Sequence, residues 1–231
     1  MRAAYFDMLG GASGNMLLGA LVDAGGDFNA VVRILETIPV QGWTIACERV
    51  ERRGQRAIYI DVVVPGEDDH FDHPEAHRHP AGKRTLADVL QLFERSQISS
   101  PQREIARRIA ERLSRAEGTD RFHPVGQIDA ILDIAATCIA LEQLGVEQVF
   151  CSPFPVGLRS PAATERLLGG APRRHEEIDM EMVTTTGAAI LTTLVARPGE
   201  RPKLRRSREG YGAGRSDFPI PNVTRVEIGE L

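Results

Sequence analysis

The stretch RAAYFDMLGGASGNMLLGALV, residues 2–22, decides the fold, because it passes from a strand through a glycine-rich turn into a helix. Residues 2–6 predict a short strand, and Gly10, Gly11 and Gly14 interrupt the pattern. Apolar side chains then return at helical spacing over residues 16–22. A strand followed directly by a helix is typical of α/β proteins.

The rest of the chain alternates between the same two patterns. Helices are predicted over residues 29–38, 85–94, 100–117, 127–144, 162–168 and 187–195, and strands over residues 149–156 and 223–228. Two further β-rich runs, 43–50 and 57–64, predict a hairpin that turns at Gly54. Because a hairpin is antiparallel, we expect an α/β fold in which helices pack on a layered mixed sheet with this early hairpin.

Local signals refine these boundaries. Thr85 can cap the helix that runs through residue 94, and Ser100 with Pro101 and Glu104 is typical of a helix start. Residues 209–214, EGYGAG, are too rich in glycine for a stable strand interior, although they allow close backbone approach.

Length and charge limit the possible functions. The 231 residues can bury one substantial core or two small ones, and we expect residues 1–231 to form a single domain. With 28 basic and 32 acidic residues the net charge is -4, so no overall basic field attracts nucleic acid. No apolar stretch approaches the roughly 20 residues of a membrane helix, and no signal-peptide core follows Met1. We therefore expect a cytoplasmic protein with no membrane partner.

Cysteine usage gives no sign of a metal cluster. The three cysteines, Cys47, Cys138 and Cys151, are odd in number and contain no C-x-x-C pair. We expect them to be buried free thiols.

The glycine-rich turn is the first candidate site. Glycines between a strand and a helix leave backbone N–H groups free to hold an anion such as phosphate, which makes Gly11, Ser13 and Gly14 candidates. Asp7 ends the strand, where α/β proteins place ligands. A tight turn capped by Ser13 is the alternative, and both interpretations stay open.

The second candidate is DDHFDHPEAHRH, residues 68–79, within a long loop of residues 65–83 that we expect to be flexible. Imidazoles and carboxylates together suit divalent ions such as nickel or zinc, so His70, His73, His77 and His79 are candidate ligands. Ordering such a loop costs entropy, which favours weak and exchangeable capture. A solvated loop without ligands stays the alternative.

The third candidate is FHPVGQIDAILD, residues 122–133, in which His123 precedes a helix that carries Asp129 and Asp133. A spacing of four residues places both carboxylates on one face of the helix. Apolar neighbours imply that this face is partly covered, and adjacent buried carboxylates repel unless a cation or a proton intervenes. The alternative is one capping acid and one solvent-facing acid.

Two smaller features complete the survey. Thr184 and Thr186 stand in TTTG before a helix, as an anion site or as ordinary capping residues. His175 lies among charged residues, which predicts a solvated surface position.

Taken together, these blocks resemble one family. The chain contains D-x-x-x-G-x-S-G-x-M from residue 7, the His-rich loop, F-H-x-V-G-x-x-D-x-x-x-D from residue 122, S-P-x-P-V-G from residue 152, T-x-T-G-A-A from residue 184 and G-Y-G-A-G-x-x-D-F-P-x-P-N-V from residue 210. Their order and extent are similar to those of the nickel-insertion family sometimes called LarC.

The resemblance implies a reaction. Members insert nickel into pyridinium-3,5-bisthiocarboxylic acid mononucleotide and consume CTP, which yields the nickel-pincer nucleotide that lactate racemase uses. It implies nickel and CTP, with Mn²⁺ or Mg²⁺ as a further metal. Thiocarboxylates are soft donors and the substrate carries a phosphate, so the site needs a route for nickel and groups that hold an anion.

The resemblance also assigns residues by position. It implies that Asp7, His123, Asp129 and Asp133 are catalytic, the last three also as metal ligands, and that Gly11, Ser13, Gly14, Thr184 and Thr186 hold the nucleotide. The chain departs from the family at Met8, Asn15 and Pro124, where the family usually has Cys, Asp and Glu. The segment of residues 157–164 is shorter, and the family's usual CTP-binding second half does not follow Leu231.

Two functions remain open at this stage. In one, the chain binds nickel and the mononucleotide, and a separate CTP-binding chain completes the enzyme. In the other, the missing groups have ended catalysis and left a nickel storage or delivery module. Self-association into a homo-oligomer also stays open.

Overall fold

The chain is organised around β1 (Arg2–Asp7). The computed structural model describes residues 1–64, 84–118 and 127–231. In it β1 pairs in parallel with β4 (Gln148–Cys151) on one side and antiparallel with β8 (Val223–Glu230) on the other. The predicted opening strand is confirmed and is one residue longer than expected.

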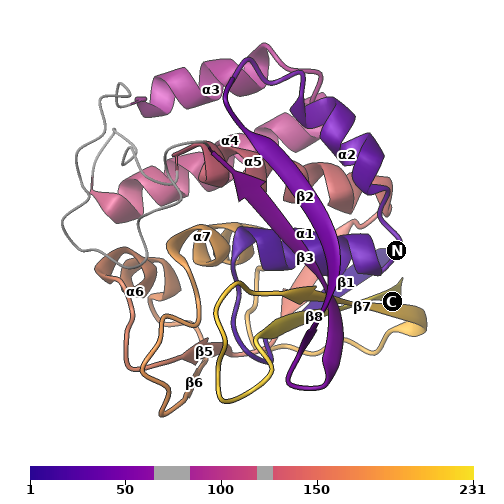
Figure 1. Cartoon of the computed structure of the whole chain (residues 1–231), viewed down its shortest axis with the longest axis vertical. Helices are drawn as coiled ribbons and strands as arrows, with labels where there is room; N and C mark the ends of the chain where they lie inside the picture. The colour runs from indigo at the N-terminus through magenta and orange to yellow at the C-terminus, as the bar shows by residue number, and fades with distance from the viewer. Residues whose placement is uncertain (65–83, 119–126) are drawn as a thin grey trace.

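A six-stranded sheet carries the fold. Its order is β2 (Thr44–Arg52), β3 (Gln55–Val63), β7 (Arg205–Ala213), β8, β1 and β4 (Figure 1). Two of the pairings are parallel, β1 with β4 and β3 with β7, and the others are antiparallel. The α/β class and the mixed sheet are therefore confirmed.

The predicted hairpin is formed by β2 and β3, which pair from Thr44 opposite Val63 to Arg52 opposite Gln55. Arg53 and Gly54 make the turn with φ angles of 50° and 85°. A two-residue turn with both φ angles positive matches the twist of the flanking strands, and glycine adopts that conformation without a steric cost. The hairpin prediction is confirmed with its turn at Gly54.

Helices are layered away from the sheet. α1 (Gly14–Asp23) packs on β3, β7 and β8, and its other side packs on α5 (Gln127–Gln143). α4 (Ser100–Glu117) packs on α5, and α3 (Leu86–Glu94) packs on α4. Figure 1 shows α3, α4 and α5 in the upper half of the view and β7 and β8 in the lower half, with α1 between them and the long hairpin of β2 and β3 crossing the view. The core therefore lies on both sides of α1.

β7 corrects the expectation for residues 209–214, because residues 209–213 form the end of a strand. A Cβ added at Gly210 would lie 2.3 Å from the Ala20 carbonyl oxygen, and one at Gly212 would lie 1.9 Å from that of Met16. The glycines let α1 pack directly on the strand backbone, so burial compensates for their weak strand propensity. The predicted close approach is confirmed.

The helix starts follow capping chemistry. Asp27 caps α2 (Phe28–Leu35) by accepting from Ala30 N–H at 3.0 Å. Thr85 caps α3 as the sequence predicted, and Asp88 completes a capping box with it. The predicted range of α4, residues 100–117, is confirmed, but its cap residue is Ser99 instead of Ser100, and the Ser99 side chain makes no capping bond. Boundaries of this kind are set by backbone geometry, which the sequence indicates only within a residue or two.

The strand predicted over residues 149–156 is two strands. Proline has no N–H to donate, and after Pro153 the chain leaves the main sheet. β5 (Phe154–Val156) then pairs with β6 (Arg173–His175) in a small separate sheet beyond α6 (Ala162–Leu168). His175 is exposed, as expected from its charged neighbours.

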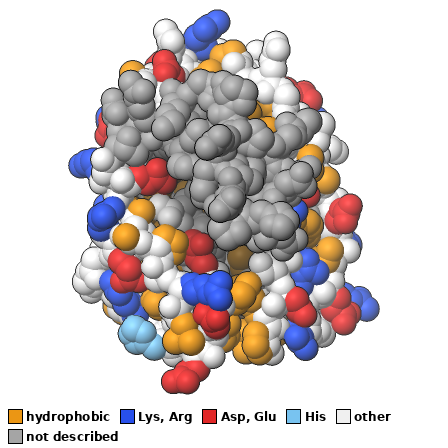
Figure 2. All heavy atoms as spheres, turned by 60° about the vertical axis from the view of Figure 1, so that its left-hand side comes forward, with side chains coloured by type: hydrophobic (Ala, Val, Ile, Leu, Met, Phe, Trp, Pro, Cys, Tyr) orange, Lys and Arg blue, Asp and Glu red, His pale blue; other side chains and the backbone are white. Residues whose placement is uncertain are grey.

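The surface agrees with the modest net charge. On the face in Figure 2, the described acidic and basic side chains stand side by side in many places. Among the helices that the structure describes, none combines the length and apolar character needed to cross a bilayer.

The last helix, α7 (Thr185–Leu194), begins two residues before the predicted range.

Candidate functional site

The turn after β1 lies against the segment that leads into α7. Ala12 N–H donates to the Met182 carbonyl oxygen at 2.9 Å, and Thr184 N–H donates to that of Ala12 at 2.9 Å. This short parallel bridge joins residues that are about 170 positions apart. It brings two of the sequence motifs, the glycine-rich turn and TTTG, into contact.

Two glycines allow three helix ends to converge. A Cβ on Gly187 of α7 would lie 2.5 Å from the Ala12 carbonyl oxygen, so α7 can touch the turn only without a side chain there. A Cβ on Gly14 would lie 2.2 Å from an Asp133 carboxylate oxygen. The start of α1 therefore meets α7 and the face of α5 that carries the acid pair.

Asp133 lies at the N-terminus of α1. It accepts a hydrogen bond from the backbone N–H of Asn15, where the helix dipole favours a negative group. Burial and the neighbouring Asp129 nevertheless raise the pKa of Asp133 well above its usual range. The position that the sequence offered to a bound anion is thus taken by a carboxyl group of the chain itself.

Ser13 is the N-cap residue of α1 but does not cap it. Its side chain makes no capping bond and its hydroxyl instead donates to the Asn15 Oδ1 at 2.5 Å. Asn15 Nδ2 in turn donates to the Ile60 carbonyl oxygen at 3.1 Å. The alternative of a turn capped by Ser13 is therefore wrong, because Asp133 occupies the capping position.

A cavity of about 380 Å³ lies where these elements meet. It includes five of the residues that the sequence singled out: Ser13, Asp129, Asp133, Thr184 and Thr186. The other lining residues that carry polar side chains are Asn15, Tyr59, Asp61, Glu181, Arg215, Ser216 and Asn222. The structure thus gathers motifs from four separate parts of the sequence into one hollow, which we call the acidic cavity.

The lining is predominantly negative. Asp61, Asp129, Asp133 and Glu181 stand against one basic side chain, Arg215. Glu181 has an exposed surface, yet the protein packed around its carboxyl group raises its pKa. Several carboxyl groups with few basic neighbours favour a bound cation, which would offset their mutual repulsion.

The sequence did not single out Tyr59 and Asp61. They stand two residues apart on β3, so they share a face, and the Tyr59 hydroxyl donates to Asp61 Oδ1 at 3.0 Å. Burial, followed by Asp61, raises the pKa of Tyr59 to about 12. The alternation of side chains along the hairpin could have shown that Tyr59 and Asp61 share a face. No residue near them in the sequence indicated that the end of β3 lies beside α5.

Asp7 does not reach the acidic cavity. Phe6 lies in the main core beneath the helices, whereas Tyr5 packs in a small cluster on the opposite face, and Asp7 follows the parity of Tyr5. Its carboxylate binds Arg225 at 2.8 Å. The position at the end of the strand was identified correctly, but the direction of the side chain removes Asp7 from the site.

The capping role predicted for Thr184 is confirmed. Its hydroxyl accepts from Gly187 N–H at 3.1 Å. Thr186 lines the cavity beside it, at the start of α7 where backbone N–H groups have no helical partner. Gly11 has a φ of 144°, and its carbonyl oxygen accepts from the Thr224 hydroxyl at 2.6 Å. Its position is therefore backbone structure rather than lining.

All of the histidines proposed as ligands lie outside the described residues. These are His70, His73, His77 and His79 in the long loop, and His123 before α5. In the parts of the chain that the structure does describe, no group of three or more His, Cys, Asp or Glu side chains is arranged to hold a metal ion.

The cysteines are free thiols. Cys138 and Cys151 are buried, and burial raises the pKa of each to about 12. Cys47 is half-buried, and burial raises its pKa as well. The expectation of buried free thiols is confirmed for Cys138 and Cys151, where a thiolate is disfavoured, whereas Cys47 is only partly buried.

The chain thus combines an α/β fold with an acidic cavity at the starts of α1, α5 and α7. A family model described as "Nickel insertion protein" matches residues 4–230, and the chain belongs to this family.

Curated relatives agree with that assignment. A protein of Desulfitobacterium hafniense (strain DSM 10664 / DCB-2) is 40% identical over 250 residues and bears the name "Pyridinium-3,5-bisthiocarboxylic acid mononucleotide nickel insertion protein". A protein of Thermotoga sp. (strain RQ2) with the same name is 36% identical over 253 residues. A "Putative nickel insertion protein" of Dictyoglomus thermophilum is 34% identical over 250 residues.

The similarity covers all of this chain but only part of each relative. The matched region is 59% of the Desulfitobacterium protein, 62% of the Thermotoga protein and 61% of the Dictyoglomus protein. The chain therefore spans about three fifths of the length of these relatives. No solved structure matches it.

Proposed function

We propose that this chain is the part of a nickel-insertion enzyme that receives nickel and holds pyridinium-3,5-bisthiocarboxylic acid mononucleotide. Membership of the nickel insertion family supports this function, as do the names of the relatives. The chain spans about three fifths of their length, and we assign CTP and the Mg²⁺ or Mn²⁺ that accompanies it to a CTP-binding part outside these residues, either a further segment or a partner chain.

The observation that carries the proposal is the convergence of Asp129, Asp133 and the start of α7 around one cavity. Nickel enters as a substrate and is attracted by the carboxyl groups. The raised pKa of Asp133 fits this role, because a carboxyl group that resists ionisation alone ionises readily when a dication approaches. Oxygen donors hold nickel loosely, so the softer thiocarboxylates of the substrate can take the ion from them.

The phosphate of the mononucleotide is assigned to the start of α7. Asp133 already occupies the N-terminus of α1 and Asp129 stands in the first turn of α5, whereas the first turn of α7 contains no acid. The N–H groups and the hydroxyl of Thr186 would bind the phosphate there, beyond the capping bond of Thr184. His123 and the four loop histidines stay candidate carriers of incoming nickel.

A direct test is mass spectrometry of the nucleotide after incubation with nickel, CTP and purified substrate. The product should gain nickel when the chain is combined with a CTP-binding partner. The gain should be lost when Asp129→Asn and Asp133→Asn are combined. A product formed equally well by that folded variant would overturn the assignment.

Calorimetric nickel titration tests the metal site alone. We expect Asp129→Asn with Asp133→Asn to weaken nickel binding at least tenfold, which is about 1.4 kcal/mol. Asp27→Asn is the matched control, because Asp27 lies outside the cavity and Asn caps a helix as well as Asp does. A variant with His70, His73, His77 and His79 replaced reports separately on the loop, and unchanged affinity and stoichiometry would remove the loop from the model.

A second function, nickel storage or delivery without catalysis, is favoured by Asn15. The family usually has Asp at this position, and here the amide is held by Ser13 and by the Ile60 carbonyl oxygen. A neutral amide that donates a hydrogen bond cannot replace a carboxylate as a ligand. Nickel binding without any product, even with a CTP-binding partner present, would select this function over insertion.

A further inference from the structure

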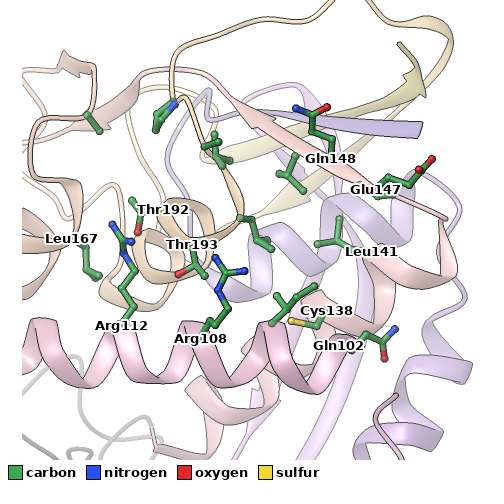
Figure 3. Close-up of a pocket in the computed structure, with 18 of the residues that line it drawn as sticks. Gln102, Arg108, Arg112, Cys138, Leu141, Glu147, Gln148, Leu167, Thr192 and Thr193 are labelled. Atoms are coloured by element: carbon green, nitrogen blue, oxygen red, sulfur yellow. The ribbon is translucent and has the colours of Figure 1, made fainter. Parts of the chain in front are cut away.

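A second and larger cavity lies at the other ends of the helices that form the acidic cavity. Its volume is about 960 Å³, within the range of small-molecule sites. It is lined by one face of α4, the last turns of α5 and α7, the start of β4 and the segment after α6 (Figure 3). Asp133 and Leu141 on α5 belong to different cavities, about 12 Å apart along the helix.

Two arginines of α4 point into this second cavity. Figure 3 shows Arg108 and Arg112, one helical turn apart, extending from α4 towards Thr192 and Thr193 of α7. Within the described part of the chain, neither guanidinium group makes a hydrogen bond or an ion pair. Two exposed positive groups therefore line the same space, and the protein counter-charge recorded for them is a coulombic interaction of Arg108 with Glu104.

Other arginines of α4 are engaged. Arg103 binds Glu94 at 2.5 Å, Arg107 binds Glu104 at 2.6 Å, and Arg115 Nε donates to the Glu111 carbonyl oxygen at 3.2 Å. Arg103 and Arg107 show that acidic partners are available to arginines elsewhere along α4. Arg108 and Arg112 differ from these three because they line the cavity.

The carboxylates of the second cavity lie at its other end, near Gln102 and Gln148 (Figure 3). Glu147 Oε1 accepts from the Arg2 backbone N–H at 2.8 Å, and Glu142 Oε1 accepts from the Ser99 hydroxyl at 2.9 Å. These acids already have donors from the protein. These hydrogen bonds leave the negative charges in place, so the described lining holds two arginines and two glutamates, with the positive groups gathered at the arginine end.

Apolar side chains supply most of the remaining lining. They are Ile105, Leu141, Val146, Val149, Leu167, Leu168, Ala171, Pro172, Leu194, Val195, Ala196 and Pro198. Such a lining gains free energy by covering an apolar or aromatic surface. Charge at one end and apolar surface along the length together define the chemistry of a ligand.

We propose that this cavity binds a small organic anion, with a phosphate, sulfonate or carboxylate group between Arg108 and Arg112 and an apolar or aromatic body along the lining. Guanidinium groups bind such oxyanions through charge-assisted hydrogen bonds. The site is distinct from the acidic cavity and does not depend on the proposed nickel chemistry. A competing explanation is that the arginines only complement the carbonyl end of α7, which would stabilise the fold without a ligand.

The test uses the full chain and the fluorescent probe 8-anilinonaphthalene-1-sulfonate, an aromatic anion. We expect saturable binding to the wild type, weakened about tenfold when Arg108→Gln and Arg112→Gln are combined. The matched control is Arg115→Gln, which removes one charge from the same helix outside the cavity and should retain affinity. The uncharged probe N-phenyl-1-naphthylamine should bind all three proteins equally.

The outcomes separate the explanations. Equal sulfonate binding by the wild type and the double variant would overturn the proposal, and so would the same loss in Arg115→Gln. Lower thermal stability of the double variant with unchanged probe affinity would favour the role at the end of α7. Nickel titration of the double variant should match the wild type. Failure of the anion-site proposal therefore would not contradict the nickel function proposed for the acidic cavity, and failure of the nickel function would not contradict the anion site.

Discussion

The two cavities are built on the same pair of helices and differ in how charge is arranged. At the N-terminal ends of α5 and α7 the described lining contains four acids and one arginine. At their C-terminal ends the described lining contains two arginines at one end and two glutamates at the other. One pair of helices therefore lines both an acidic hollow and a hollow of divided charge.

The comparison also separates two kinds of evidence. Residues of the acidic cavity come from short motifs that can be recognised in the sequence, such as TTTG and the acid pair on α5. Residues of the second cavity come from the middle of an amphipathic helix and from helix ends, which have ordinary composition. Only packing reveals that they face one space.

The largest expected effect tests the packing that forms the acidic cavity. Gly14→Ala would place a Cβ 2.2 Å from the Asp133 carboxylate and force α1 away from α5. We expect a loss of about 3 kcal/mol in the free energy of unfolding by urea denaturation. Gly170→Ala is the control, because nothing lies within 4 Å of its added Cβ. Equal stability of the two variants would mean that the helices are not in close contact.

Asp133→Asn should stabilise the metal-free protein at neutral pH by about 2 kcal/mol, since a buried charge no longer has to form. The sign follows from the raised pKa of Asp133. A carboxyl group whose pKa is higher in the folded protein costs no stability below its pKa in the unfolded chain, which is about 4. The free energy of unfolding then falls as the pH rises from that value through the pKa of the folded protein. Urea denaturation from pH 4 to 8 should show the difference growing with pH, and a constant difference would contradict it.

Asp7→Asn should cost roughly 1.5 kcal/mol, because the partly buried Arg225 loses its closest partner and keeps only Glu209, at 3.4 Å. Nickel affinity measured by calorimetry should not change, since Asp7 lies on the far face of the sheet. A large fall in affinity without loss of stability would return Asp7 to the metal site.

The smallest effect concerns the start of α7. Thr184→Ala removes the bond to Gly187 N–H and should cost about 1 kcal/mol in thermal or urea unfolding. Thr184→Ser keeps a hydroxyl at the cap and should stay within a few tenths of the wild type. If both variants behave alike, the cap does not stabilise the helix.

Much of the fold follows from local patterns. The hairpin could be predicted because Gly54 and the two alternating runs are adjacent in the sequence, and α3 because Thr85 and Asp88 form a complete cap. β7 could not, because Gly210 and Gly212 weaken a strand unless a helix packs directly on it. That helix, α1, is nearly two hundred residues away in the sequence.

The site was predictable only in part for a similar reason. The spacing of Asp129 and Asp133 fixes their shared face, so the pair could be found. The position of Asp7 at the end of its strand could be predicted, but the face of the sheet on which its side chain lies could not. Tyr59, Asp61 and Glu181 join the lining through tertiary packing alone, and no nearby residue marks them.

The order of the strands has a consequence for how the protein is made. β7 and β8, which come last in the chain, lie between the early hairpin and β1 in the sheet. Before β7 and β8 have been synthesised, no strand connects the hairpin to β1. The surface of α1 that packs on β7 also stays uncovered until then. We therefore expect slow folding of high contact order, because the centre of the sheet cannot form before residues 205–230 have been synthesised.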